Sequence, residues 1–366
     1  MALKAGIVGL PNVGKSTLFN AITKQNILAA NYPFATIEPN VGIVTVKDKR
    51  MDRLVEVCIP DSIVPTAYEF TDIAGLVKGA SSGEGLGNKF LSHIREVDAI
   101  VEVVRCFENA DITHVEGKVD PIRDIEIINV ELILSDLEII QNRISKIGKK
   151  AESTKDKEVL SEVAVLKKCE AGLLSDSPLR RIDLSEEEID IIKHFHLITL
   201  KPIIYAANVT EEDAVVGVNK YTKQVVEYAS KENARVVVMC ASIESELAEL
   251  DEEEKEVFLS ELGIKESGLD NLVKATYDLL GLKTFFTAGK QEVRAWTFKS
   301  GMKAPACAGV IHTDFQKGFI KAEVMSYEDL DKFGNESSVK AAGRLRLEGK
   351  EYVMQDGDIC HFRFNV

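Results

Sequence analysis

The 366-residue sequence predicts an α/β fold with a mostly parallel sheet, an inserted α-helical hairpin and a small, sheet-rich C-terminal domain. Three patterns support this prediction: strand-like and helical segments alternate early in the chain, a helical periodicity dominates the middle, and short strand-like runs follow near the C-terminus. A chain of this length is expected to form several domains, and its 45% hydrophobic and 28% charged residues are ordinary for a globular protein.

The alternation in the first part is typical of βα units around a parallel sheet. Two similar apolar runs return later in the chain, and we expect them in the same sheet. The expected strands are Ala5–Val8, Val41–Val46, Ala67–Thr71, Ala99–Val104, Pro202–Ala207 and Val236–Cys240. The expected helices between them are Ser16–Thr23 and Gly87–Glu96.

The middle of the chain carries two apolar series with helical spacing. The first is Ile133, Leu137, Ile140, Ile144 and Ile147, and the second, after a polar stretch, is Val159, Val163, Leu166 and Leu173. These series predict an antiparallel coiled-coil hairpin inserted into the sheet domain. Two ordinary amphipathic helices packed on the main core remain an alternative, because each series lasts only about two heptads.

After Gly281 the sequence pattern changes to short strand-like runs separated by turn residues. These runs are Val293–Phe298, Ala308–His312, Phe319–Val324, Lys350–Met354 and Ile359–Phe364. A small C-terminal domain is therefore expected. The expected domain limits are 1–125 with 200–282 for the sheet domain, 126–199 for the hairpin and 283–366 for the C-terminal domain.

The composition and net charge argue against several classes of protein. A net charge of −14 argues against a chain that coats nucleic acid along its whole length, although residues 283–366 hold 13 Lys and Arg against 11 Asp and Glu. Four basic residues there are candidates for an RNA or ribosome surface beside the hairpin: Lys317, Lys321, Arg344 and Arg346. No apolar run is long enough for a membrane span, no signal peptide is visible, and six scattered cysteines indicate reduced thiols in a cytoplasm.

The strongest motif is a phosphate-binding loop. Gly9–Ser16 matches GxxxxGK[ST] and lies between a strand that ends at Val8 and a helix that begins near Lys15. Backbone N–H groups of such a loop and the N-terminus of the following helix bind phosphates, while the lysine reaches the β- and γ-phosphate oxygens. We therefore expect nucleotide contacts from Asn12, Val13, Gly14, Lys15, Ser16 and Thr17, with Lys15 also serving catalysis by bearing phosphate charge. The Ser16 hydroxyl is expected on Mg²⁺.

A second motif, Asp72-Ile73-Ala74-Gly75, follows a predicted strand and has the DxxG pattern of a switch GTPase. Asp72 is expected to hold Mg²⁺ through its water shell, and the Gly75 N–H to meet the γ-phosphate. Thr36, between the two motifs, is expected to give Mg²⁺ a second hydroxyl when the γ-phosphate is present. The glycine-rich segment Gly75–Gly87 is expected to reorder with the nucleotide.

The base-recognition segment departs from the NKxD motif of a guanine site. Here a predicted strand leads into Asn208, Val209, Thr210 and Glu211, so the lysine is missing and glutamate replaces aspartate. Losing the bidentate guanine contact should reduce guanine discrimination, and we expect ATP to bind at least as well as GTP. Ser242 is expected beside the base. A guanine-preferring GTPase that uses other contacts remains an alternative.

Leu76 occupies the position where many GTPases carry a glutamine that orients water. Help with hydrolysis must then come from a K⁺ ion, a partner or another side chain. Asn12 could help to hold K⁺, and His114, in a polar loop, could orient or deprotonate water. A simply exposed histidine is the alternative for His114.

Taken together, GIVGLPNVGKSTLFNA from Gly6, NYPFATIEPN from Asn31, DIAGLVKGASSGEGLGNKFL from Asp72 and NVTE from Asn208 resemble the YchF family of Obg-like ATPases. RCFEN from Arg105 and AGKQEVRAWTF and GVIHTDFQKGFIKAE near the C-terminus extend the resemblance over the whole chain. The resemblance implies a P-loop G domain, a coiled-coil hairpin and a C-terminal, ubiquitin-like TGS domain. It also implies hydrolysis of ATP in preference to GTP, slow turnover, stimulation by K⁺, and association with the ribosome or its 50S subunit in the cytoplasm. We separately expect a monomer. A nucleotide-gated binding module with incidental hydrolysis remains a second hypothesis.

Overall fold

The computed structural model describes residues 4–26, 40–73, 86–154 and 156–365. Their contacts divide the chain into two units. The first contains the described residues up to 43 and those of 69–276, and the second contains 44–68 and 277–365. The units are described separately below.

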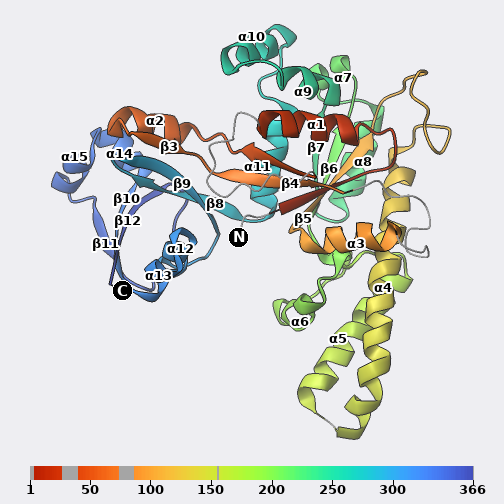
Figure 1. The fold of residues 1–366 in the computed structure, drawn as a ribbon. Helices are drawn as coiled ribbons and strands as arrows, with labels where there is room; N and C mark the ends of the chain where they lie inside the picture. Colours follow the sequence, from red (N-terminus) through yellow and green to blue (C-terminus); the bar gives the residue numbers. More distant parts are fainter. Residues whose placement is uncertain (1–3, 27–39, 74–85, 155, 366) are drawn as a thin grey trace. The chain divides into compact units, whose positions relative to one another are not determined.

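The first unit is built on a six-stranded sheet with the order β2-β4-β1-β5-β6-β7 (Figure 1). Its strands are β1 (Lys4–Val8), β2 (Val41–Thr45), β4 (Ala67–Asp72), β5 (Ala99–Arg105), β6 (Ile203–Asn208) and β7 (Arg235–Met239). The pairs β1–β4, β1–β5, β5–β6 and β6–β7 are parallel. Strands β5 and β6 are buried along their whole length, as expected for central strands covered on both faces. The predicted α/β fold and all six of its predicted strands are confirmed.

Helices connect the strands of this sheet, and further helices follow β7, its last strand in the chain (Figure 1). They are α1 (Lys15–Asn26), α3 (Leu86–Glu96), α7 (Glu211–Val216), α8 (Lys220–Ser230), α9 (Ala241–Leu247), α10 (Glu252–Leu262) and α11 (Gly268–Leu279). Several begin at a side-chain cap that satisfies backbone N–H groups of the first turn: Asn219 caps α8 and Asp251 caps α10.

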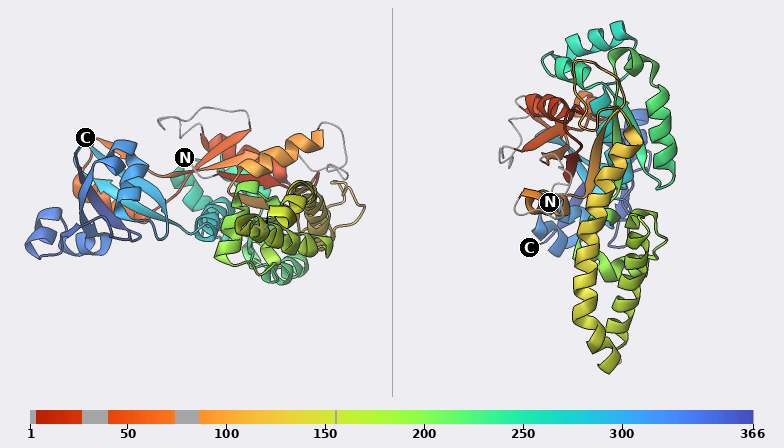
Figure 2. Two further views of the ribbon diagram at one scale, coloured as in Figure 1. Left: turned by 90° about the horizontal axis from the view of Figure 1, so that it is seen from below. Right: turned by 90° about the vertical axis from the view of Figure 1, so that its right-hand side faces the viewer.

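Residues between β5 and β6 form the inserted hairpin. Helices α4 (Pro121–Thr154) and α5 (Lys157–Leu174) run side by side in every view, and both apolar series from the sequence lie in one hydrophobic cluster (Figures 1 and 2). Shorter elements return the chain to the sheet: η1 (Leu179–Arg181), α6 (Glu186–Ile192), η2 (Lys193–Phe195) and η3 (Ile198–Leu200). The start of α4 buries Ile125, Ile128 and Leu132, so the hairpin rests on the sheet domain at one end only.

The second unit contains another six-stranded sheet, with the order β11-β10-β12-β8-β9-β3. Its strands are β3 (Ser62–Val64), β8 (Leu282–Ala288), β9 (Glu292–Lys299), β10 (Phe319–Ser326), β11 (Arg346–Glu348) and β12 (Asp358–Phe364). Its helices are α2 (Lys49–Cys58), α12 (Ala304–Ile311), α13 (Thr313–Lys317), α14 (Tyr327–Phe333) and α15 (Glu336–Ala341). Its identity as a TGS domain stays a prediction.

An early segment of the chain belongs to this second unit. Strand β3 pairs with β9 in parallel, and Met51 and Leu54 of α2 lie in one hydrophobic cluster with Phe286 and Val293. The sequence placed this segment within 1–125, because its apolar residues alone do not reveal a partner more than two hundred residues away. The domain limits themselves stay a prediction.

Two predicted strands of the C-terminal region are wrong. Ala308–His312 lies mostly in helix α12, and Lys350–Met354 makes only an isolated bridge, from Val353 to Lys303. Helix α12 has a proline in its first turn and several alanines, which favour a helix start and helix propagation. A short apolar run cannot by itself distinguish a buried helix from a strand, and here the helix-forming residues decide the outcome.

Candidate nucleotide-binding site

The phosphate-binding loop lies where the sequence predicts it, between β1 and α1. Asn12 and Gly14 both have positive φ values, 63° and 98°, and Leu18 N donates to Gly14 O at 3.0 Å to begin the helix. Only glycine fits two of the loop positions. A Cβ at Gly9 would lie 2.8 Å from Val103 O, and one at Gly14 would lie 2.2 Å from the side-chain nitrogen of Asn208. The loop is thus shaped by contacts with β5 and β6, and it presents the first N–H groups of α1.

The two most strongly predicted charged residues meet at this loop. Lys15 forms an ion pair with Asp72, although 57 positions separate them in the sequence, and their side chains are 11% and 24% exposed. A lysine Nζ and a carboxylate that converge at the start of α1 suit a site for a phosphate and its magnesium ion. Ser16 and Thr17, in the first turn of α1, are exposed and open to ligands. Thr36, Gly75 and Leu76 lie outside the described residues.

Asn208 connects the phosphate-binding loop with the end of β7. Its side-chain nitrogen donates to Val13 O at 2.9 Å, and its side-chain oxygen accepts from Ala241 N at 2.9 Å. Asn208 is only 4% exposed, so both hydrogen bonds are shielded from water. One side chain therefore fixes the distance between the phosphate side and the predicted base side of the site.

A cavity of about 630 Å³ opens beside this bridge. Its walls come from four segments: the phosphate-binding loop, the loop after β5, the segment after β6 and the start of α9. The lining residues include Asn12, Gly14, Thr17, Phe107, Glu108, Asn109, Ile112, Asn208, Val209, Glu211 and Ser242. Every described residue that the sequence assigned to the base thus borders this cavity, together with an aromatic side chain, Phe107, that sequence reasoning did not select.

Two side chains of the predicted base segment differ in burial and in hydrogen bonding. Val209 is 3% exposed, and its N–H donates to Met239 O at 2.9 Å, so it is part of the core as well as of the wall. Glu211 is exposed at the start of α7, and its Oε1 accepts a hydrogen bond from Ser242 Oγ at 3.3 Å. The carboxylate and the hydroxyl of the predicted base site are therefore neighbours.

Arg105 is a site-shaping residue that the sequence analysis did not assign. Its buried guanidinium donates to three backbone oxygens of the loop after β5, at Phe107 (3.2 Å), Asn109 (3.2 Å) and Ile112 (3.0 Å). Burial lowers the pKa of Arg105 from its ordinary value. A charged side chain that satisfies three carbonyls fixes the loop that forms one wall of the cavity. The available sequence signal was an arginine at the end of a mostly apolar strand, where a charge requires buried partners.

His114 lies in the predicted loop, but it is buried and not exposed. Its Nε2 lies 2.8 Å from Asp124 Oδ2, and its Nδ1 accepts the N–H of Glu116 at 3.1 Å. Because Nδ1 accepts, the Nε2 proton is the one directed at Asp124, and both ring nitrogens are engaged in this conformation. The preceding residue, Thr113, accepts from the side chain of Asn12 at 3.2 Å, which places this loop against the phosphate-binding loop. The catalytic role of His114 stays a prediction.

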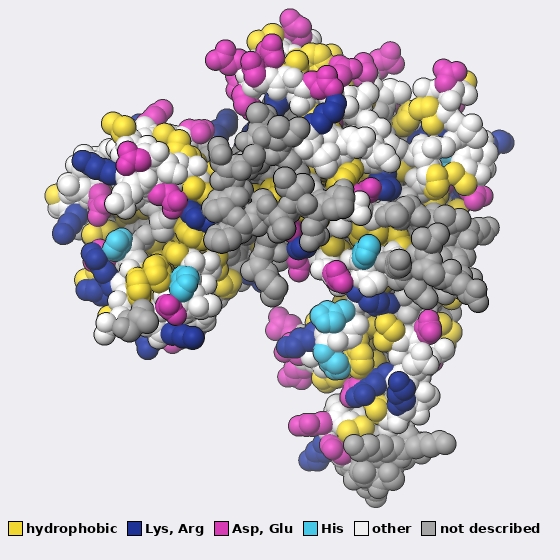
Figure 3. All heavy atoms as spheres, viewed as in Figure 1, with side chains coloured by type: hydrophobic (Ala, Val, Ile, Leu, Met, Phe, Trp, Pro, Cys, Tyr) yellow, Lys and Arg dark blue, Asp and Glu magenta, His cyan; other side chains and the backbone are white. Residues whose placement is uncertain are grey.

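The charged surface offers limited support for the four basic candidates. Arg344 lies 3.9 Å from Asp329, and Arg346 contacts Asp358 at 3.3 Å, so both are already in ion pairs, whereas Lys317 is exposed at the end of α13. Figure 3 shows acidic side chains gathered over α10, a face that would repel nucleic acid.

Two further expectations concern the whole chain. All six cysteines are free and five are buried, as predicted for reduced thiols. Among the described helices, none combines the length and the apolar character that a membrane span requires.

Comparisons with known proteins agree with this geometry. Two family models match: one described as "50S ribosome-binding GTPase" over residues 4–135, and YchF-GTPase_C, described as "Protein of unknown function (DUF933)", over residues 282–365. The chain is 61% and 56% identical to the proteins named "Ribosome-binding ATPase YchF" of Bacillus subtilis (strain 168) and Haemophilus influenzae, over 100% of each chain. The solved structure of the Schizosaccharomyces pombe YchF GTPase superposes with a TM-score of 0.89 at 44% identity, covering 99% of this chain and 97% of that one. The names of these relatives differ in the nucleotide that they mention.

Proposed function

Since this chain belongs to the YchF family of ribosome-binding ATPases, we propose that it hydrolyses ATP in preference to GTP and that the bound nucleotide controls its association with the ribosome. The observation that carries the proposal is a phosphate-binding loop and a relaxed base site joined by one buried side chain, Asn208. The first holds any nucleoside triphosphate, and the second determines which base is preferred.

The phosphate side supplies charge and orientation. Lys15 would exchange its carboxylate partner Asp72 for phosphate oxygens when the nucleotide enters, while the N–H groups at the start of α1 hold the β-phosphate. Members of this family use Mg²⁺, and two described donors fit it: the exposed Ser16 hydroxyl, and Asp72 through water. Thr36, outside the described residues, stays a candidate from the sequence alone. Within the described ranges, no cluster of three acidic, His or Cys side chains could form a protein cage for a metal, so Mg²⁺ would need phosphate and water ligands too. The ion would neutralise charge that develops on the phosphates.

The base side explains the proposed preference for ATP. A guanine site depends on an aspartate that accepts two base N–H groups, whereas here the carboxylate belongs to Glu211 and one of its oxygens already accepts from Ser242. The lysine that would lie along the base is replaced by the buried Val209. Phe107 lines the same cavity and offers an apolar surface to a purine of either kind. Without the lysine, and with the carboxylate on a longer side chain that already accepts a hydrogen bond, guanine is expected to lose its advantage over adenine.

The site offers few side chains that could activate the water molecule for hydrolysis. Among described residues near the phosphates, Asn12 directs its side-chain nitrogen to Thr113 O, which leaves its oxygen as a candidate ligand for K⁺. A cation there would stabilise developing charge as an arginine finger does. His114 could act only if its pair with Asp124 opened, so slow hydrolysis is expected until a partner rearranges this loop.

The partner side of the proposal follows the family. We propose that the chain acts as a cytoplasmic monomer that binds the ribosome through its large subunit, with contacts to RNA where basic residues are not in ion pairs. Lys317 and Lys321 remain candidates, while Arg344 and Arg346 would first have to leave Asp329 and Asp358.

The first test is equilibrium binding of ATP and GTP analogues to the purified chain with Mg²⁺, in K⁺ and in Na⁺ buffers. We expect tighter binding of ATP, and hydrolysis that is faster in K⁺. The variant Lys15→Ala should lose both nucleotides and serves as the control for binding at this site. Tighter GTP binding would show that this is a guanine switch and that the base site has been misinterpreted.

A binding module with incidental hydrolysis is a second candidate, and the geometry of His114 favours it, because neither ring nitrogen is available to water. The two candidates differ in what Lys15→Ala does to ribosome association. If the variant binds ribosomes as the parent chain does, with and without ATP, nucleotide does not control the association and the switch proposal fails.

A further inference from the structure

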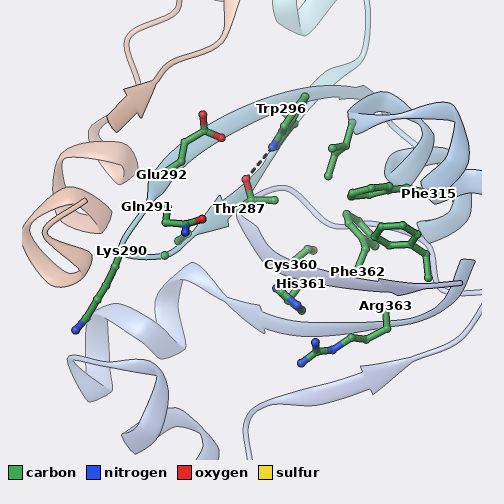
Figure 4. A pocket seen from close by; sticks show the side chains of 14 residues that line it. Thr287, Lys290, Gln291, Glu292, Trp296, Phe315, Cys360, His361, Phe362 and Arg363 are labelled. Carbon is green, nitrogen blue, oxygen red and sulfur yellow. Dashed lines mark hydrogen bonds between the residues drawn. The ribbon is translucent and has the colours of Figure 1, made fainter. Parts of the chain in front are cut away.

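The two units contain cavities of similar volume, about 640 Å³ in the second unit and about 630 Å³ at the nucleotide site. Polar side chains that line the first of these have partners close by. The Trp296 indole N–H donates to Thr287 at 2.9 Å (Figure 4). Arg363 contacts Glu323 at 3.2 Å. The nucleotide cavity differs, because a side chain outside its lining, Asn219, holds two of its walls.

All four hydrogen-bonding positions of the Asn219 side chain are occupied. Its oxygen accepts the backbone N–H groups of Tyr221 at 2.9 Å and Thr222 at 2.8 Å, which caps helix α8. Its nitrogen donates to Cys106 O and to Asp213 Oδ2, both at 2.8 Å. An asparagine side chain has two acceptor and two donor positions, so none is left for a ligand. Asn219 therefore acts on the nucleotide only through the groups that it holds.

The two groups that accept from the Asn219 nitrogen belong to two different walls of the nucleotide cavity. Cys106 directly precedes Phe107 in the loop after β5, and Asp213 lies in the first turn of α7, two residues after Glu211. Phe107 and Glu211 line the cavity, whereas Asn219 is not among the described residues that line it. One amide nitrogen thus connects the loop after β5 to the start of α7.

The backbone of Cys106 is held on both sides. Its N–H donates to Asn208 O at 2.8 Å, and its carbonyl accepts from Asn219. The next carbonyl, that of Phe107, accepts from Arg105 at 3.2 Å, and the Arg105 guanidinium lies 4.7 Å from the centre of the Phe107 ring. Cys106 is fully buried, so losing the Asn219 donor would leave its carbonyl without that partner. The wall that carries Phe107 would lose one of the contacts that fix it.

Helix capping uses only half of the Asn219 side chain. A cap needs an oxygen that accepts N–H groups of the first turn, and serine and aspartate supply one about as well as asparagine. The Asn219 nitrogen takes no part in capping α8, because both of its donations leave the helix. An aspartate at this position would also bring a second carboxylate next to Asp213. The cap and the contact between the walls are therefore separable by substitution.

Other contacts between α8 and the loop after β5 are exposed. Glu108 pairs with Lys220 at 2.8 Å and also accepts from the hydroxyl of Tyr221. The side chains of Lys220 and Glu108 are 70% and 65% exposed, and exposed ion pairs of this kind contribute little to stability. The half-buried Asn219 is therefore the stronger connection between this helix and the loop.

We propose that Asn219 is a positioning residue for the purine of the bound nucleotide, acting through Cys106 and Asp213 to keep two walls of the base cavity at a fixed separation. This inference rests on the proposed function, because it takes the cavity as the base site. The phosphate-binding loop is held separately by Asn208, and none of the four hydrogen bonds of Asn219 reaches that loop. A change at Asn219 should therefore weaken contacts to the base and preserve contacts to the phosphates.

The first test is Asn219→Ser, which keeps a cap for α8 and removes both donations. Binding of an ATP analogue and of inorganic tripolyphosphate to the full-length protein, each with Mg²⁺, is measured by calorimetry. We expect the analogue to bind about tenfold more weakly and tripolyphosphate affinity to stay within about twofold. Asn335→Ser makes the same change at the cap of α15 in the second unit and should alter neither affinity.

The contact with Asp213 is tested by exchanging the two residues. Asn219→Asp alone places two carboxylates together and should weaken the analogue at least as much as Asn219→Ser. Asp213→Asn alone keeps an acceptor for the Asn219 nitrogen and should change little. The two changes combined restore a donor and an acceptor between α7 and α8, so affinity should recover about threefold or more relative to Asn219→Asp alone. A role in capping only predicts no recovery, because aspartate caps α8 in both variants.

The outcomes separate this inference from the proposed function. It is overturned if Asn219→Ser leaves binding of the ATP analogue unchanged or weakens tripolyphosphate equally, or if the double variant binds the analogue no better than Asn219→Asp. If the parent protein binds the analogue, Lys15→Ala abolishes that binding and Asn219→Ser does not affect it, the proposed function stands and the positioning role alone fails. A parent protein that does not bind the analogue would overturn both.

Discussion

Replacing Asn208 with alanine tests whether one side chain holds the two halves of the nucleotide site together. The change removes hydrogen bonds of 2.9 Å to Val13 O and from Ala241 N, and it leaves both backbone groups without that partner. A buried hydrogen bond contributes about 1 kcal/mol net, and a buried group left unsatisfied costs about 1–3 kcal/mol. Water from the adjacent cavity could reach part of the gap. We therefore expect the free energy of unfolding to fall by about 2–3 kcal/mol, and ATP affinity to fall about ten- to a hundredfold because the two loops lose their spacing.

The assays are urea unfolding followed by circular dichroism, and equilibrium titration with ATP. Asn129→Ala is the matched control: Asn129 is also 4% exposed and also has two side-chain hydrogen bonds, to Tyr228 (3.1 Å) and from Arg180 (2.6 Å). Neither of its partners belongs to the nucleotide loops, so it should destabilise the fold similarly while ATP affinity changes less than about twofold. Equal losses of ATP affinity in the two variants would refute the argument, because the effect would then be general destabilisation.

Three further predictions concern other parts of the chain. The double change Val209→Lys and Glu211→Asp should move the ratio of ATP to GTP affinity toward GTP by about tenfold or more; an unchanged ratio in competition binding would remove the base-site argument. Glu102 is 1% exposed, and burial raises its pKa well above the usual value. The folded state therefore retains a proton that the unfolded state loses above about pH 4.3, and stability should fall as pH rises through that window, by up to about 1.4 kcal/mol per pH unit. Glu102→Gln should flatten this slope in urea unfolding between about pH 5 and 8, and a slope identical to that of the parent chain would contradict it. Cys58 is the one cysteine that is not buried, so it should react first with a thiol reagent in the native protein; mass spectrometry of the modified peptide checks the order.

The sequence was sufficient for the parallel strands, the phosphate-binding loop and the hairpin of the first unit, because their signals are local. Most strands of the parallel sheet are short, largely apolar runs, and GxxxxGK[ST] requires a strand before it and a helix after it. Both apolar series of the hairpin also pack together as their spacing predicts. In these segments, local propensity and tertiary packing favour the same structure.

The remaining features depend on contacts that spacing does not encode. Asn208 could be selected from its motif, but its partner Val13 is 195 positions away and became visible only in the structure. Arg105 looked like the end of a strand, yet its role comes from three carbonyls in the loop that follows. The segment with α2 and β3 joined the second unit for the same reason, because strand pairing between Ser62 and Glu292 leaves no local trace.

Helix α4 of the hairpin contacts the rest of the nucleotide-binding unit through two buried carboxylates. These contacts limit how a movement at the nucleotide site could reach a partner bound to the hairpin. Near its start, Asp124 of α4 accepts from His114, whose loop touches the phosphate-binding loop. Further along α4, the fully buried Asp136 accepts backbone N–H groups from Ile198 and Thr199 and pairs with Arg95 of α3, the helix that follows the DxxG segment. Burial raises the pKa of Asp136, so its charge depends on these partners remaining in place. A change on the phosphate side that moved α3 or the His114 loop would therefore either carry α4 with it or leave a buried carboxylate without its partners, and the second outcome is costly. Movement of the hairpin together with α3 thus has the lower free-energy cost. A partner that binds the hairpin would in turn favour one conformation of the loops around the nucleotide.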